Sequence, residues 1–189
     1  MVVSDDELMI RLAKGEDQAL NELMDRWGGR VAAFLHRMTG QRETGADLAQ
    51  ETFVKIYQAS ARYKPGGNFS TYLFSIASNL AKNHARWKSR HPTVAMDAAA
   101  EEDAGDWGSL ADPGKTPDEA AQSAEKCRAV HAAFLRLPAD LREAMSLFID
   151  EGLSYAAIAA VAQCSPKAVE TRIYRARQLL REQLSEFTQ

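Results

Sequence analysis

Residues 154–181 decide the fold of this chain: they read SYAAIAAVA over 154–162, QCSP over 163–166 and KAVETRIYRARQLLR over 167–181. Ser154 and Ser165 are favoured N-cap residues, and Pro166 fits the first helical position, where its missing N–H leaves no hydrogen bond unmade. The pattern therefore predicts two helices joined by a tight turn. In the second helix, one apolar stripe holds Val169, Ile173, Ala176, Leu180 and Leu184, and the opposite face holds Lys167, Thr171, Tyr174, Arg175 and Gln178. This layout is typical of a helix-turn-helix, whose second helix enters the major groove of DNA, although a basic, solvated helical hairpin has a similar pattern.

The other segments also have helical periodicity and helical end signals. Ser4 and Glu7 form a capping box, a stripe that starts at Leu20 stops at Gly40, and Ser70 is expected to cap a further helix. The expected helices start at Ser4 and then cover 20–39, 44–61, 70–90, 117–136, 138–152, 154–162 and 166–184. No strand-like alternation of useful length is present, so the sequence predicts an all-α fold.

Length and composition indicate a globular protein of one or two domains, with 189 residues of which 46% are hydrophobic. No apolar run approaches the ~20 residues of a membrane span, and the N-terminal MVVSDDELM is acidic where a signal peptide is basic and then apolar. We therefore expect a cytoplasmic protein without membrane insertion. Cys127 and Cys164 lie outside any CxxC or Cys/His cluster, which favours buried free thiols over a zinc site or a disulfide.

Charge is distributed unevenly along the chain. Residues 92–122 contain eight acidic residues and one lysine, so the remainder carries +4 although the whole chain carries −3. Proline and glycine recur between residues 92 and 114 among alanines and acidic residues, which indicates a flexible acidic linker over 92–116. We therefore predict two small helical domains, 1–91 and 117–189, with the helix-turn-helix in the second.

The helix expected over 70–90 carries two distinct faces. Leu73 and Leu80 belong to a core face, and about 110° away lies a polar stripe of Asn79, Asn83, Arg86 and Arg90. Arginine neutralises phosphate and asparagine can hydrogen-bond a base edge, so this stripe is typical of a nucleic-acid contact, although a solvated polar face is the plain alternative.

The loop before that helix reads RYKPGGNFSTY over 62–72. Its aromatic rings can stack on unpaired bases, its amides and hydroxyls can read base edges, and its glycines let the backbone approach closely. We therefore expect the loop to bind single-stranded DNA, through Arg62, Tyr63, Lys64, Asn68, Phe69, Ser70 and Thr71. By contrast, the helix over 47–58 places Asp47, Gln50 and Glu51 beside outward apolar residues, which favours a protein partner over DNA.

In this order, the segments resemble the extracytoplasmic-function (ECF) sigma factors, compact specificity subunits of bacterial RNA polymerase that keep only regions two and four. The resemblance rests on DLAQETFVKIYQ (47–58), FSTYLFSIASNLAKNHAR (69–86), the acidic linker and LPADLREAMSLFIDEGLSYAAIAAVAQCSPKAVETRIYRARQLLRE (137–182). It implies a transcription initiation factor that binds core RNA polymerase and promoter DNA, needs no cofactor and is not an enzyme.

The resemblance also implies roles for individual residues. The helix matching DLAQETF docks on the clamp helices of the polymerase β′ subunit, through Asp47, Gln50, Glu51 and Phe53. The segment 62–90 reads the −10 element: its loop captures a base flipped from the non-template strand, and Asn79, Asn83, Arg86 and Arg90 lie along that strand. The second domain meets the β flap and reads the −35 element through Ser165, Lys167, Glu170, Thr171, Arg172, Tyr174 and Arg175.

Two positions depart from the family pattern. Gln163 stands in the turn where the family often has glycine, and Glu170 stands where a basic or small residue is usual. Because an acidic side chain repels phosphate but can accept a hydrogen bond from cytosine N4, Glu170 indicates an altered −35 preference. The resemblance further implies that the acidic linker threads the basic channels of the polymerase, and that a separate anti-sigma protein silences the factor.

Two rival functions fit parts of the sequence. An ordinary helix-turn-helix regulator would bind duplex DNA unaided as a two-fold dimer, but no dimerisation helix or ligand domain is evident. An enzyme would need a catalytic constellation. The four histidines are scattered, and HExxH, P-loop and GxSxG motifs are absent.

Overall fold

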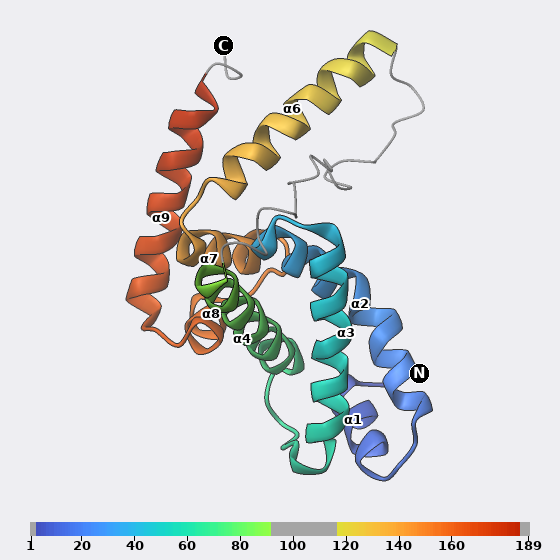
Figure 1. The fold of residues 1–189 in the computed structure, drawn as a ribbon. Coiled ribbons are helices and arrows are strands. Elements are labelled where there is room, and N and C mark those ends of the chain that lie inside the picture. The colour runs from blue at the N-terminus through green and yellow to red at the C-terminus, as the bar shows by residue number, and fades with distance from the viewer. Residues whose placement is uncertain (1–2, 92–116, 186–189) are drawn as a thin grey trace.

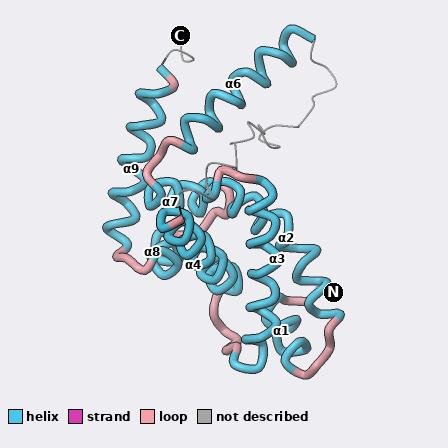
Figure 2. Tube along the Cα trace, viewed as in Figure 1, coloured by secondary structure: helices cyan, strands magenta, loops and turns pink. Residues whose placement is uncertain are grey.

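The computed structural model describes residues 3–91 and 117–185. Within these two ranges every regular element is a helix (Figure 2), which confirms the all-α prediction. The helices are α1 (Asp5–Ala13), α2 (Gln18–Thr39), α3 (Arg42–Ala59), the 3-10 helix η1 (Ser60–Arg62), α4 (Phe69–Arg90), α6 (Pro117–Leu135), α7 (Ala139–Ile149), α8 (Tyr155–Ala162) and α9 (Pro166–Gln183). The acidic linker expected over 92–116 lies outside the described residues. We call α1–α4 the N-terminal domain and α6–α9 the C-terminal domain.

Three helices begin at the predicted serine caps. The side chains of Ser4, Ser154 and Ser165 each accept a hydrogen bond from the backbone N–H three residues on, at 3.1–3.2 Å. The predicted cap at Ser70 is wrong. Asn68, two residues earlier, caps α4 instead and accepts from the Ser70 N–H at 3.1 Å, so Phe69 is the first residue of the helix and its ring is buried in the core.

An aromatic core holds the N-terminal domain together. Phe34 and Phe74 are fully buried with ring centroids 5.3 Å apart, and Trp27 meets Phe74 edge-on at 6.3 Å and Phe69 at 5.9 Å. Such edge-to-face pairs contribute about 0.5–1.5 kcal/mol each beyond the area that they bury. These contacts fix where α4 and the loop before it lie relative to α2.

The C-terminal domain contains the predicted helix-turn-helix. Ile158 and Val161 of α8 and Val169 and Ile173 of α9 are fully buried, or nearly so, where the two helices meet. Gln163 ends α8 in the left-handed region with φ 53°, and it is the one non-glycine residue with positive φ in the part of the chain that the structure describes. This conformation costs about 1–2 kcal/mol for a residue with a Cβ, and the buried helix pair holds it in place.

The two domains are in direct contact, an arrangement that the prediction of two linked domains did not include. In Figure 1, α8 lies against α4, and α7 lies against α2, while α6 projects away from the body. The carboxylate of Glu143 in α7 is buried at this contact, pairs with Lys82 Nζ of α4 at 2.8 Å and accepts a hydrogen bond from Ser78. The first helix of the helix-turn-helix therefore packs on the same helix that carries the predicted single-strand contacts.

Candidate nucleic-acid interfaces

The outer face of α9 presents most of the predicted duplex contacts. Lys167, Thr171, Tyr174 and Arg175 are exposed, while the opposite stripe packs into the core, as the sequence pattern predicts. Tyr174 is 61% exposed, and it accepts a hydrogen bond from Gln178 at 2.9 Å. This face can offer hydroxyl groups and cations to a groove of DNA.

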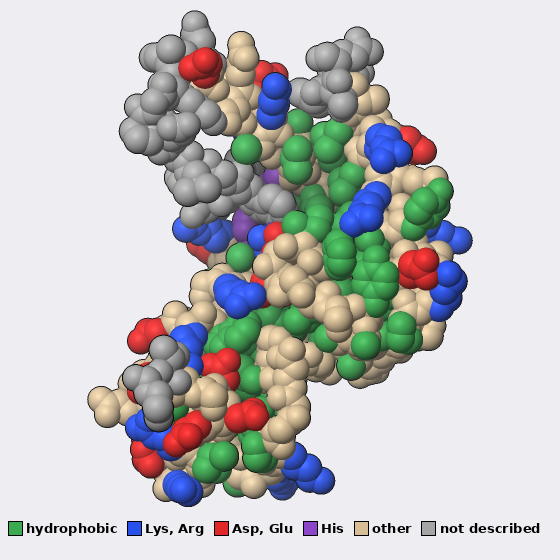
Figure 3. Space-filling view, turned by 180° about the vertical axis from the view of Figure 1, so that it is seen from behind, with side chains coloured by type: hydrophobic (Ala, Val, Ile, Leu, Met, Phe, Trp, Pro, Cys, Tyr) green, Lys and Arg blue, Asp and Glu red, His purple; other side chains and the backbone are tan. Residues whose placement is uncertain are grey.

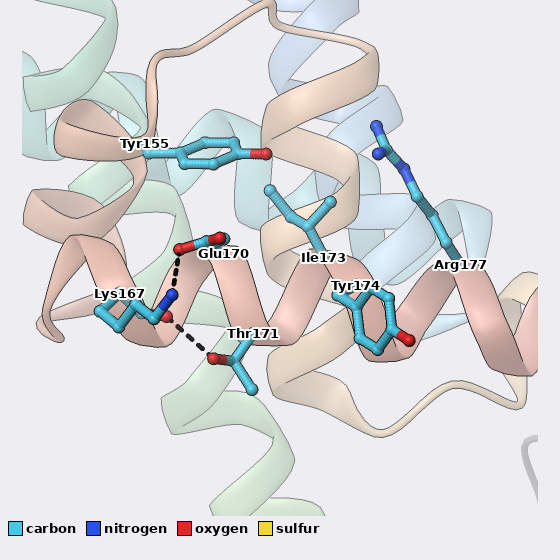
Figure 4. Close-up of a pocket in the computed structure, with 7 residues that line it drawn as sticks. All are labelled: Tyr155, Lys167, Glu170, Thr171, Ile173, Tyr174 and Arg177. Carbon is cyan, nitrogen blue, oxygen red and sulfur yellow. Dashed lines mark hydrogen bonds and ion pairs between the residues drawn. The ribbon is translucent and has the colours of Figure 1, made fainter.

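A cavity of about 380 Å³ opens between α8 and α9 on this face (Figure 4). Lys167 Nζ pairs with Glu170 Oε2 at 2.8 Å, and Thr171 donates to the Lys167 carbonyl at 3.0 Å. Glu170 therefore neutralises the neighbouring lysine in the absence of DNA. Tyr155 and Arg177 also line the cavity, and neither was among the predicted DNA contacts. Tyr155 reaches the cavity from α8, so the pattern of α9 could not reveal it.

Arg172 differs from the other predicted contacts of α9. Its Nε lies 3.3 Å from Asp140 of α7, its guanidinium also donates to the Cys164 sulfur at 3.5 Å, and its side chain is only 24% exposed. The reason is helical phase, since residue 172 points between the buried stripe and the exposed face. In this structure Arg172 fastens α9 to α7 instead of facing solvent.

The loop before α4 forms a second cavity, of about 260 Å³. It is lined by Arg62, Tyr63, Lys64, Gly67, Asn68 and Tyr72. The Tyr63 ring lies 5.2 Å from that of Tyr72 at an interplanar angle of 55°, so the wall contains aromatic surface next to two cations. Four of the predicted loop contacts line this cavity: Arg62, Tyr63, Lys64 and Asn68. Gly67 and Tyr72 also line it and were not among the predicted contacts.

Two predicted loop contacts are buried in this structure. Phe69 and Ser70 are 4% and 7% exposed, because Phe69 packs on Trp27 and Ser70 turns inward in the first turn of α4. Thr71 is half-buried. In this structure Phe69 and Ser70 support the cavity from behind and do not present a surface to DNA.

The polar stripe of α4 is exposed as predicted. Asn79, Asn83, Arg86 and Arg90 all reach solvent along one side of the helix, beyond the loop cavity. His84 is half-buried on the neighbouring face, where burial and the nearby charge of Lys88 lower its pKa. The stripe thus offers two guanidinium groups and two amides to a strand that leaves the loop.

The predicted protein-contact face of α3 is exposed except at one residue. Asp47, Gln50 and Glu51 reach solvent together with the apolar Val54, which is 52% exposed. Phe53, also predicted as a polymerase contact, is 3% exposed: it lies on the core side of the helix and anchors α3 to its neighbours.

Burial is the largest cause of the pKa shifts of Arg37, Asp150 and Glu151, which lie between the domains. Arg37 pairs with Asp150 at 3.3 Å and Arg30 with Glu151 at 2.7 Å. Burial raises the pKa of both Asp150 and Glu151, and the arginine charges offset this shift only in part. Burial likewise lowers the pKa of Arg37. Ion pairs of this kind orient the domains more than they stabilise the contact, because desolvation of the charges opposes their attraction.

The described residues contain no group of histidine, cysteine, aspartate and glutamate side chains that could hold a metal ion. None of the helices in these residues is both long and apolar enough to cross a membrane. Cys127 and Cys164 are free and half-buried.

Comparison with known proteins identifies the family. The family described as Sigma-70 region 2 matches residues 23–91, and that described as Sigma-70, region 4 matches residues 127–180. The chain is 34% identical over 179 residues to the ECF RNA polymerase sigma-E factor of Escherichia coli strain K12, covering 94% of this chain and 93% of that protein. It is 32% identical over 176 residues to the RNA polymerase sigma-H factor of Pseudomonas aeruginosa, covering 93% and 91% of the two chains.

Solved structures show the same fold. The sigma factor RpoE of Bartonella quintana, solved in complex with the anti-sigma factor NepR, matches with a TM-score of 0.70 and 24% identity over 87% of this chain and 96% of that chain. The two matched family regions fall in the N-terminal and C-terminal domains respectively. The chain therefore belongs to the ECF sigma factors, non-enzymatic factors that bind RNA polymerase and promoter DNA and initiate transcription.

Proposed function

We propose that the two exposed surfaces divide promoter recognition between them. The loop cavity and the α4 stripe take the unpaired non-template strand of the −10 element, and the outer face of α9 takes the −35 duplex. The observation that supports this most is that Tyr72, which lines the cavity, lies about two helical turns before Asn79 on the same side of α4, the side that carries the exposed Asn83, Arg86 and Arg90. Stacking surface plus amides suits unpaired bases, whereas α9 offers the groove-facing layout of a recognition helix.

Polymerase contacts fall on other faces in this proposal. The exposed Asp47, Gln50 and Glu51 of α3 dock on the β′ clamp helices, with Val54 adding apolar area, and the buried Phe53 holds the helix in position. The C-terminal domain meets the β flap. Residues 1–91 and 117–189 act as separate modules on the polymerase, and the acidic 92–116 segment enters its basic channels.

Promoter binding requires the domains to separate. The −35 and −10 positions are about 25 base pairs apart by their names, which is about 85 Å at roughly 3.4 Å per base pair. A compact chain of this length has a radius of gyration of only about 16 Å. The contact between α4 and α8 therefore belongs to the free factor, and polymerase holds the domains apart.

An anti-sigma protein is a further partner in this proposal, and the cytoplasm is the site of action. Hydrophobic side chains gather on one face of the C-terminal domain, flanked by lysines and arginines (Figure 3). Val130 and Ile149 are exposed large apolar residues of the C-terminal domain. Such a surface fits a protein partner that covers it when the factor is inactive.

The proposed division can be tested with Asn83→Ala and Arg175→Ala in the full chain bound to core polymerase. Asn83→Ala should leave closed complexes intact and reduce the melted fraction seen by permanganate reactivity. Arg175→Ala should reduce closed complexes first. Equal losses at both steps in both variants would contradict the division.

A further inference from the structure

A single carboxylate ties the loop before α4 to the first helix. Asp6, in the first turn of α1, accepts a hydrogen bond from the Tyr63 hydroxyl and another from the Gly66 backbone N–H at 2.9 Å. The partners are 57 and 60 residues away in the sequence. These bonds are therefore tertiary links between the start of the chain and the loop, and not part of either local structure.

The two hydrogen bonds restrain the loop at two places, the aromatic wall of the cavity and the turn at Gly66. Tyr63 supplies an aromatic wall of the 260 Å³ cavity, and its ring packs against Tyr72 at 5.2 Å and Phe69 at 6.3 Å. Gly66 has φ +98°, a conformation that side chains rarely adopt and that turns its N–H toward Asp6. Asp6 thus fixes both the wall and the turn that closes the cavity.

The chemistry of Asp6 excludes a direct role in DNA contact. A carboxylate repels phosphate, and both oxygens already accept from the loop. These two donors lower the pKa of Asp6, while burial and the carboxylate raise the pKa of Tyr63. An ionised acceptor therefore faces a neutral phenol throughout the neutral pH range, which is the state in which the bond is strongest.

We propose that Asp6 is a positioning residue for −10 recognition, which shapes the loop cavity through Tyr63 and Gly66 and so determines which unpaired base the cavity accepts. This inference rests on the proposed single-strand function of the loop. A pre-formed cavity avoids the entropy cost of ordering the loop when DNA binds, so loss of the link should weaken single-strand binding about tenfold, the effect of one or two lost hydrogen bonds.

The test compares Asp6→Asn and Tyr63→Phe with the control Glu7→Gln in the full chain. Tyr63→Phe keeps the ring and deletes only the donor, and Glu7→Gln removes a neighbouring exposed charge of the same helix. Each holoenzyme selects from fork-junction DNA whose −35 segment is duplex and whose unpaired −10 strand is randomised. Core affinity, the selected −35 sequence and the base preference at each unpaired position are measured separately.

We expect all variants to bind core polymerase and to select the same −35 sequence. Asp6→Asn and Tyr63→Phe should bind the selected fork about tenfold more weakly and lose base preference at one unpaired position, whereas Glu7→Gln should behave as wild type. Wild-type base preference and affinity in either test variant would overturn the proposal. If the wild-type holoenzyme itself selected no −10 sequence, the proposed function would fail, a result distinct from failure of the Asp6 link.

Discussion

Replacing Lys82 by methionine should open the contact between the two domains. The change keeps the length of the side chain and removes the ammonium group that lies 2.8 Å from the carboxylate of Glu143. Glu143 is 1% exposed, so its carboxyl group would lose its cationic partner in a buried site and keep the hydrogen bond from Ser78. An uncompensated buried charge disfavours the closed arrangement.

The magnitude follows from the burial of the pair. Removing one partner of a fully buried ion pair costs about 3–5 kcal/mol, and an exposed pair contributes about 0–1 kcal/mol. The Lys82 side chain is 32% exposed, which places this pair between the two limits, at about 2 kcal/mol. That energy raises the ratio of open to closed molecules by roughly 30-fold.

Energy transfer between dyes on the two domains would measure the effect. Gln58→Cys and Arg181→Cys, both at exposed sites, would carry the dyes after the two native cysteines are changed to serine. The control is Lys55→Met, which removes an exposed lysine 3.5 Å from Glu51 on the surface of α3. Its energy transfer should equal that of the unmodified sequence.

A second variant separates charge from packing. Adding Glu143→Gln to Lys82→Met removes the uncompensated carboxylate, so the double variant should recover part of the closed population. If energy transfer in Lys82→Met were indistinguishable from that in Lys55→Met, the buried pair of Lys82 and Glu143 would contribute nothing to closure.

Three further predictions concern separate parts of the chain. Gly45→Ala should destabilise the protein to urea by about 2 kcal/mol or more, because a Cβ there would lie 2.7 Å from the backbone nitrogen of the facing α2 helix. Arg172→Ala should lower the stability of the C-terminal domain by about 1–2 kcal/mol in urea titrations, because its guanidinium holds α9 to α7. Asp6→Asn should lower the free energy of unfolding at neutral pH, because the ionised Asp6 carboxylate stabilises the folded state above the ordinary aspartate pKa. Wild type loses this advantage as the pH falls through the lowered pKa of Asp6, so the unfolding free energies of wild type and variant should converge below about pH 4.

Each of these has a matched control or a contradicting result. A Cβ added at Gly67 would have no atom within 4 Å, so Gly67→Ala should leave the free energy of unfolding nearly unchanged. Equal losses of stability in Gly45→Ala and Gly67→Ala would contradict the argument from close approach at Gly45. Arg175→Ala, on the exposed face, should leave stability unchanged, and the opposite order of the two arginines would refute their assignment. A wild-type advantage over Asp6→Asn that grows on acidification would show that the sign of the Asp6 linkage is wrong.

Local signals predicted the helices because they act within one turn. Serine hydroxyls at the start of α1, α8 and α9 and the apolar stripe of α9 need no knowledge of the rest of the chain. The exposed stripe of α4 was predictable for the same reason, since helical phase alone separates Asn79 and Asn83 from the core face.

Tertiary contacts determine the surroundings of Phe53, Phe69 and Arg172, which local sequence patterns did not predict. Phe53 and Phe69 each stand beside an exposed residue, Val54 and Asn68, and the packing of α3 and α4 shows that both rings are buried. Arg172 was predicted from its position in the recognition helix, but Asp140 of another helix holds it. The contact between the domains, and the link from Asp6 to the loop, join residues too distant in sequence for any periodicity to reveal.

Transcription from a promoter library with purified factor and core RNA polymerase tests the proposed function as a whole. We expect initiation only when both proteins are present, at promoters that share a −35 and a −10 motif, with the −10 preference altered by changes in the 62–68 loop and the −35 preference by changes on α9. Tight binding to duplex DNA without polymerase, and no transcripts with it, would rule out this polymerase-dependent recognition of two promoter elements.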